Sequence, residues 1–337
     1  MLYKNMQTLN LLNKNILLFY PFGATIHYGE SIKAELERRG AYVMGYDERP
    51  SQNSIAKIII RLFKKKIPYI FSVYIKKIIK KNKNIDFDYI LVLRGEAFTK
   101  QSIDLLRNKY KNATFILYLW DVLKSNNLKE VIPFFDRAFS FDPEDVLENK
   151  KLIFRPTFYI PDYKRIAKKN NIRNEIVFIG TLHSNRYNLL KMIKDYLVNN
   201  KITFFYYLYV PSRLIFIKNI YFDRIPINKQ IINFTPISLE RTLKVIQESK
   251  CILDLNFTGQ KSLSMRAFEA MASKTKYITI NPEIKKYDFY NDTNILVLDI
   301  QKLNIPREFI NSPFKEIPSS VLDNYSVTKL VDDLFFK

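Results

Sequence analysis

The chain of 337 residues carries 54 Lys or Arg against 33 Asp or Glu, which gives a formal net charge of +21. Hydrophobic residues make up 47% and aromatic residues 15%, so an intrinsically disordered protein is excluded and two domains with separate cores are expected. The excess of positive charge favours a polyanionic partner. Charge alone does not separate an anionic membrane from a nucleic acid.

The single cysteine, Cys251, excludes an internal disulfide. It lies in an apolar run, so we expect a buried, unreactive thiol in a reducing compartment. We find no signal-peptide pattern and no uninterrupted run of about 20 apolar residues that could span a membrane. We therefore expect a cytoplasmic protein.

The first half predicts strands followed by polar exit loops at 15–22, 41–47, 87–99, 113–125 and 135–145. A turn that contains His27 and Gly29 follows the first strand, and an amphipathic helix is predicted at 31–40. This β-α-β opening is typical of a doubly wound α/β domain. Gly23 and Gly29 lack the spacing of the dinucleotide fingerprint, so NAD binding is not expected.

Residues 54–83 are rich in lysine and contain no acid. Pro68 is predicted to divide them into two helices. The alternation of apolar and basic residues suits a helix on an anionic membrane, but it also suits a helix pair that packs on a core and solvates its basic face. The lysines expected to face a membrane or an acceptor are Lys64, Lys65, Lys66, Lys76, Lys77, Lys80 and Lys81.

The second half restarts the α/β pattern at 175–197, after a hinge at 155–170. A helix is predicted from Ser238 and a last helix after Ser326, each capped by that serine. The remaining predicted strands are 202–210, 251–257, 276–280 and 294–299.

A helix predicted at 262–273 is apolar on nearly every side, yet Ser262, Arg266, Glu269 and Ser273 share one stripe of it. One interpretation is an Arg–Glu pair inside a core. The other is a ligand site, because a helix N-terminus that follows the carboxyl end of a strand attracts phosphate.

The runs QKSLSMRAFEAMASKTKYITIN and YDFYNDTNILVLD resemble the donor-binding half of GT-B glycosyltransferases, in particular the CgeB-like and lipopolysaccharide or capsule-biosynthesis group. The resemblance implies an α/β protein of two Rossmann-like doubly wound domains that face a central cleft. It also implies a C-terminal helix that crosses back to the first domain. The corresponding boundaries are 1–160 for the acceptor-side domain, 161–318 for the nucleotide-sugar domain and 319–337 for the returning helix.

The resemblance further implies transfer of a sugar from a nucleotide-sugar, expected to be UDP-linked, to a cell-surface glycan or lipid-linked glycan. That reaction belongs at the inner face of the bacterial cytoplasmic membrane. In the related E-x7-E families the second glutamate binds the nucleotide ribose, and Glu269 falls on it. The first falls on Lys261, so its contacts are not carried over, and we expect Lys261 to face the diphosphate instead.

Candidate donor-binding residues follow from this comparison. The two glycines of the second half, Gly180 and Gly259, each follow a predicted strand and would let backbone approach a phosphate. In the family, the loop after the first strand of the second domain supplies diphosphate contacts. The full donor set is Gly180, Thr181, His183, Arg186, Gly259, Lys261, Ser262, Ser264, Arg266 and Glu269.

An inverting transfer needs a general base near the acceptor hydroxyl. His27, Glu96 and Asp121 follow strands of the first domain and are the candidates, and the sequence does not choose among them. Asp86 and Asp88 match a D-x-D metal motif but precede their strand, at the edge away from the cleft. We therefore expect no metal and no cofactor, with arginine, lysine and a helix N-terminus offsetting the diphosphate charge.

Two rival functions are considered. The first is a sugar-nucleotide epimerase on the same fold, since a fold does not fix a function. The second is a basic nucleic-acid-binding protein. Because the basic residues concentrate in one helical segment and no RRM or zinc-finger motif is present, a nucleic-acid partner is not expected.

Overall fold

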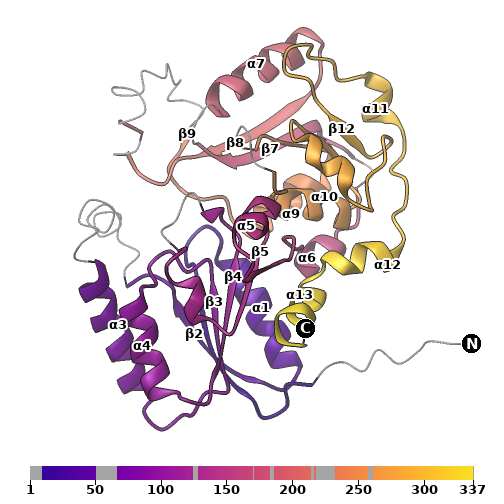
Figure 1. Ribbon diagram of the computed structural model, residues 1–337. Coiled ribbons are helices and arrows are strands. Elements are labelled where there is room, and N and C mark those ends of the chain that lie inside the picture. The colour runs from indigo at the N-terminus through magenta and orange to yellow at the C-terminus, as the bar shows by residue number, and fades with distance from the viewer. Residues whose placement is uncertain are drawn as a thin grey trace, which may run out of the picture. The chain divides into compact units, whose positions relative to one another are not determined.

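The computed structural model describes residues 10–50, 67–123, 128–169, 171–182, 186–213, 216–217, 232–256 and 261–336 (Figure 1). The chain divides into two compact units. Unit 1 comprises 1–156 with 327–337, and unit 2 comprises 157–326.

Unit 1 contains a parallel sheet in the order β2-β1-β3-β4-β5-β6. Its strands are β1 Asn15–Tyr20, β2 Tyr42–Asp47, β3 Tyr89–Leu93, β4 Thr114–Leu119, β5 Arg137–Ser140 and β6 Leu152–Phe154. Its helices are α1 Ile26–Arg38, α3 Ile67–Lys81, α4 Lys100–Lys109, the 3₁₀ turn Ile132–Phe134, α5 Pro143–Glu148 and α13 Val327–Phe336. The central strands are near-continuous apolar runs because helices cover both faces of the sheet.

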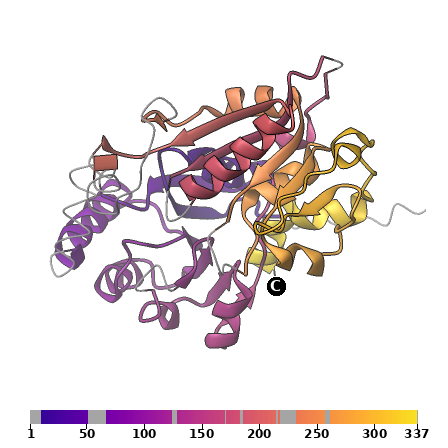
Figure 2. The same ribbon diagram turned by 90° about the horizontal axis from the view of Figure 1, so that it is seen from above.

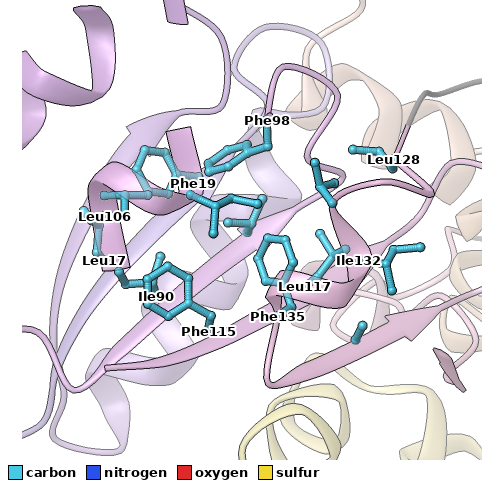
Figure 3. Packing of buried hydrophobic residues seen from close by; sticks show 14 of the residues in the cluster. Leu17, Phe19, Ile90, Phe98, Leu106, Phe115, Leu117, Leu128, Ile132 and Phe135 are labelled. Atoms are coloured by element: carbon cyan, nitrogen blue, oxygen red, sulfur yellow. The ribbon is translucent and has the colours of Figure 1, made fainter. Parts of the chain in front are cut away.

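The helices α3 and α4 cover one face of this sheet, and α1 and α13 cover the other (Figure 1). Alternate strand residues such as Leu17 and Phe19 point to the α3–α4 face, where they pack with Phe71 and Leu106. Figure 3 shows this core, in which Phe115 and Leu117 of β4 lie among the same group.

The helix α13 returns to unit 1, as the predicted fold requires. The buried guanidinium of Arg39 lies 2.6 Å from Asp332 and donates to the carbonyl of Thr328 at 2.8 Å. Arg155 lies 3.0 Å from Asp333, and both side chains are buried. Charged groups buried in this way need partners, and α13 supplies them.

Unit 2 contains a second parallel sheet in the order β12-β11-β10-β7-β8-β9. Its strands are β7 Asn174–Thr181, β8 Phe204–Tyr209, β9 Ile232–Asn233, β10 Ser249–Asp254, β11 Lys276–Thr279 and β12 Ile295–Val297. Its helices are α6 Pro161–Lys164, α7 Arg186–Asn199, α9 Leu239–Gln247, α10 Met265–Ala272, the 3₁₀ turn Pro282–Lys286, α11 Arg307–Asn311, α12 Ser319–Leu322 and the 3₁₀ turn Asp323–Tyr325.

The helix α7 packs on one face of the second sheet (Figure 2). Cys251, Leu253 and Leu255 point into the core on that face. Cys251 is completely buried, as predicted, and burial raises the pKa of its thiol to about 12. The opposite face carries α9 and α10 (Figure 1).

Both units are therefore doubly wound and Rossmann-like, which confirms the predicted fold class. The first helix differs from its prediction, because it begins at Ile26 and not at residue 31. Gly29 lies inside that helix, at a position where a Cβ would come within 2.0 Å of the Tyr20 ring of β1. The close approach of α1 to Tyr20 therefore requires a glycine there. Within the described residues, no helix has the length and apolar character needed to cross a bilayer.

Candidate functional site

The strand order of unit 2 reverses direction between β7 and β10. Counted from β7 as the first strand, the order is 6-5-4-1-2-3, which is the order of dinucleotide-binding folds. In open α/β sheets, ligands bind beyond the carboxyl ends of the strands at such a reversal. The exits of β7 and β10 are therefore the first place to look for a site.

Arg186 joins these two exits. Its Nε and Nη2 donate to the carbonyl of Leu255 at 2.8 and 2.6 Å, and its Nη1 donates to the carbonyl of Thr181 at 2.8 Å. Burial lowers the pKa of this guanidinium. Gly180 lies within β7 and not in the predicted loop, and a Cβ there would meet Phe178 at 2.7 Å and Arg186 at 3.3 Å. The structure thus brings Gly180, Thr181 and Arg186 together through contacts with one another.

Asn256 is the unusual residue at this edge. It is 7% exposed, and neither its Nδ2 nor its Oδ1 has a hydrogen-bond partner in the structure as described. Leu255 belongs to the α7-side core, which leaves its neighbours Asp254 and Asn256 on the α10 side. A buried amide without partners is costly, so its retention at a strand reversal points to a ligand. The sequence prediction missed Asn256, which it placed inside the strand predicted at 251–257, whereas β10 ends at Asp254. Its only signal was a polar residue near the end of an apolar run.

The helix α10 begins next to this edge. Ser264 is its N-cap, with an extended backbone (φ −71°, ψ 162°) and no side-chain capping bond. Its hydroxyl instead donates to Asp254 Oδ2 at 2.5 Å, and the buried Tyr277 hydroxyl donates to the same oxygen at 2.6 Å. Burial, together with the carboxylate of Asp254, raises the pKa of Tyr277. The network fixes the first turn of α10 against β10 and β11.

The helix predicted at 262–273 begins later than expected, so Ser262 does not belong to the stripe on α10. Ser262 lies before the helix, is buried, and accepts a bond from Asn281 through its carbonyl at 3.1 Å. The N-cap at Ser264 sets the first helical residue at Met265, three residues later than predicted. Lys261 precedes this turn, is 46% exposed, and lies 3.5 Å from Glu283.

Arg266 and Glu269 form an ion pair at 2.7 Å on α10, and the Glu269 side chain is completely buried. The hydroxyl of Tyr163, from α6, lies against the pair, and burial with the nearby Glu269 charge raises its pKa. This geometry matches the first interpretation given for the stripe, an Arg–Glu pair inside the core. A ribose contact of Glu269 stays a prediction.

A second polar cluster occupies the carboxyl edge of the sheet in unit 1. Glu48, just after β2, is completely buried and accepts bonds from Arg94 Nε at 2.6 Å and from Gly95 N at 3.0 Å. Arg94 has a left-handed backbone (φ 67°), which a non-glycine residue adopts only when its surroundings hold it there. Arg49 pairs with Glu96. The sequence prediction missed Glu48 and Arg49, although both follow a predicted strand.

The three candidate bases differ in their surroundings. Glu96 is held by Arg49 and lies 3.7 Å from Arg94. Asp121 is 48% exposed and lies 3.8 Å from Arg94 Nε. Desolvation by the surrounding chain raises the pKa of Asp121, and the nearby Arg94 charge opposes that rise. His27 lies in the first turn of α1, with its ring centroid 4.1 Å from that of Tyr28.

Five predicted site residues lie outside the described part of the chain. They are His183, Gly259, Lys64, Lys65 and Lys66. Asp88 accepts from Lys14 Nζ and from the backbone N–H of Asn15, each at 2.8 Å, so it fixes the amino end of the sheet. Among the residues that the structure places, no three His, Cys, Asp or Glu side chains gather as metal ligands would.

No protein-family model matches the chain, and no curated protein matches it. Solved structures do. The UDP-GlcNAc 2-epimerase of Methanocaldococcus jannaschii, in complex with UDP-GlcNAc and UDP, has a TM-score of 0.53 at 14% identity, covering 97% of this chain and 100% of that chain. The catalytic domain of starch synthase IV from Arabidopsis thaliana, bound to ADP and acarbose, has a TM-score of 0.51 at 10% identity, covering 97% and 93%.

At these identities the likeness shows the fold alone. The chain has the GT-B fold of two Rossmann-like units, as the sequence resemblance implied. Membership of the CgeB-like group stays a prediction. The two neighbours catalyse different reactions, so the shared fold does not assign an activity to this chain.

Proposed function

We propose that the protein is a glycosyltransferase that binds a nucleotide-sugar, with UDP as the expected nucleotide, at the carboxyl edge of the sheet in unit 2. The observation that carries the proposal is Asn256, a buried amide without partners at the strand reversal where this fold class binds ligands. A ligand with donors and acceptors on one edge, such as a nucleobase or a sugar, would satisfy both amide atoms.

The diphosphate would lie at the N-terminus of α10. Ser264 leaves its capping position without a side-chain bond, so the first-turn N–H groups and the helix dipole favour an anion there. The exposed ammonium of Lys261 precedes this turn in the chain and would add positive charge.

We expect no metal requirement. The test is activity after dialysis against EDTA, and a loss that Mn²⁺ or Mg²⁺ restores would contradict this part.

The proposed acceptor is a cell-envelope glycan, free or lipid-linked, of lipopolysaccharide or capsule biosynthesis. A lipid-linked acceptor would place the reaction at the inner face of the bacterial cytoplasmic membrane, with the protein held there peripherally.

Of the three candidate bases we favour Asp121, because it is half exposed and its pKa is raised, whereas Glu96 is engaged by Arg49. Asp121→Asn should lower the transfer rate by about 100-fold or more and leave nucleotide binding intact.

Nucleotide binding is tested by a thermal-shift series with UDP, GDP, CMP and dTDP. A ligand at 100 times its Kd adds about 2.7 kcal/mol of apparent stability. The wild type should respond to one nucleotide, and Asn256→Leu should lose that response while staying folded. Arg266→Ala and Glu269→Ala join the series, because their responses separate a ribose contact from an internal pair. Absence of any nucleotide response in the wild type would overturn the proposal.

The second candidate is a sugar-nucleotide epimerase, favoured by the epimerase neighbour, whose TM-score is 0.53. Product analysis separates the two. A nucleotide-sugar whose sugar changes configuration without an acceptor would identify an epimerase. Free nucleotide and an extended glycan, formed only when acceptor is present, would identify the transferase.

A further inference from the structure

The exposed residues of α3 gather on one face of the helix. At 3.6 residues per turn they fall within an arc of about 140°. They are Tyr69, Ile70, Val73, Lys76, Lys77, Lys80 and Lys81. The opposite face carries Phe71, Ile75 and Ile78, which are buried in the core of unit 1. Packing on the core of unit 1 therefore uses only one face of α3.

The exposed face changes character along its length. Its first turns present apolar side chains, with Tyr69 73%, Ile70 40% and Val73 37% exposed. Its last turns present lysines, and α3 contains no acidic residue. Pro68 lies in the first turn of α3, where a helix tolerates proline. The helix predicted before Pro68 lies outside the described residues.

We propose that this face of α3, from Tyr69 to Lys81, binds the surface of an anionic lipid bilayer. The lysines would contact the headgroup phosphates, and Tyr69, Ile70 and Val73 would enter the boundary between headgroups and acyl chains. This inference names the partner for the peripheral location proposed above, on which it builds. It does not depend on the nucleotide site, because every residue it uses lies in unit 1.

The chemistry favours a bilayer over a nucleic acid. Both attract lysines, but exposed aliphatic side chains such as Ile70 and Val73 gain nothing from a phosphodiester backbone. Burying the same side chains among acyl chains is favourable by roughly 25 cal/mol per Å² of apolar surface. Base stacking could use Tyr69 alone.

The experiment is vesicle flotation with the full chain at about 0.15 M salt. Vesicles of equal parts phosphatidylglycerol and phosphatidylcholine should carry the protein upward, and vesicles of phosphatidylcholine alone should not. Each lysine near an anionic surface contributes about fivefold to binding, so replacing four should weaken it by several hundredfold. The variant replaces Lys76, Lys77, Lys80 and Lys81 with glutamine.

A matched variant separates a local surface from net charge. It also replaces four exposed lysines with glutamine, but on other elements, and should bind vesicles like the wild type. These four lysines are Lys129, Lys164, Lys191 and Lys274. Equal losses in the two variants would overturn the proposal, and so would wild-type binding that the α3 variant retains.

A fluorescence measurement tests the apolar end. The indole of Tyr69→Trp should shift its emission to shorter wavelength on anionic vesicles, whereas the natural Trp120, 9% exposed, supplies a constant background. Unchanged emission on bound vesicles would overturn the insertion of this turn.

Binding of single-stranded RNA that depends on the four α3 lysines, with no flotation, would assign the surface to nucleic acid instead. Loss of the nucleotide response with flotation intact would refute the transferase and not this surface.

Discussion

Replacing Asn256 with leucine should stabilise the folded chain and abolish its nucleotide response. Leucine has the same number and branching of side-chain heavy atoms as asparagine, without polar groups to satisfy. Asn256 is 7% exposed, and both of its amide atoms lack partners among the described residues. An unsatisfied buried polar group costs about 1–3 kcal/mol, so we expect a gain of about 2 kcal/mol in the free energy of unfolding.

Differential scanning calorimetry checks this value without ligand. For a unit of this size, about 2 kcal/mol corresponds to a rise in Tm of about 4–8 °C. Asn294 supplies the matched control, because it is completely buried and its amide donates to the carbonyl of Lys315 at 2.7 Å and accepts from the Lys315 N–H at 2.8 Å. Asn294→Leu should therefore destabilise unit 2 by at least about 1 kcal/mol.

The reasoning would be refuted if Asn256→Leu lowered the ligand-free Tm as Asn294→Leu does. The amide would then be satisfied within the folded chain, for instance by a buried water, and would not be kept for a ligand. A stabilised variant that still responded to nucleotide would leave the amide unsatisfied but would remove it from the binding site.

Three further measurements test the structure. Burial lowers the pKa of Lys168 from 10.5 to about 8, so the unfolded chain holds that proton more tightly and stability rises with pH. From pH 7 to 9 the wild type should gain about 1 kcal/mol relative to Lys168→Met in urea denaturation, and a constant difference would contradict this. Cys251, fully buried, should react with iodoacetamide at pH 8 only as the chain unfolds, so rapid native labelling would exclude its burial. Gly29→Ala should lose about 1–3 kcal/mol through its clash with Tyr20, and Tyr20→Leu should reduce that loss; a loss independent of Tyr20 would exclude the clash.

The sequence predicted what depends on local pattern. Strands such as β4 and β10 are short apolar runs bounded by polar residues, and their burial follows from that pattern. Helix starts were less accurate because tertiary contacts decide them. Gly29 indicates a turn by its type, yet it lies within α1, where the Tyr20 ring leaves no room for a side chain.

The candidate site was predicted in part. Residues at strand exits, such as Arg94 and Asp121, are placed near one another by parallel strands, and the structure brings them within 3.8 Å. The roles of Glu48 and Asn256 depend on burial and on partners from distant segments. Glu48 is buried under Arg94, and Asn256 is buried with no partner in the described chain. No local pattern reports either property.

The return of α13 to unit 1 has a consequence for the order in which the protein can fold. Unit 2 is one continuous stretch, 157–326, whereas unit 1 is interrupted by it. During synthesis the strands of unit 1 emerge first, but Arg39 and Arg155 meet Asp332 and Asp333 only after the ribosome has added α13. We expect unit 1 to remain incompletely folded and accessible to chaperones while unit 2 folds. Unit 2 is then the natural fragment to express alone.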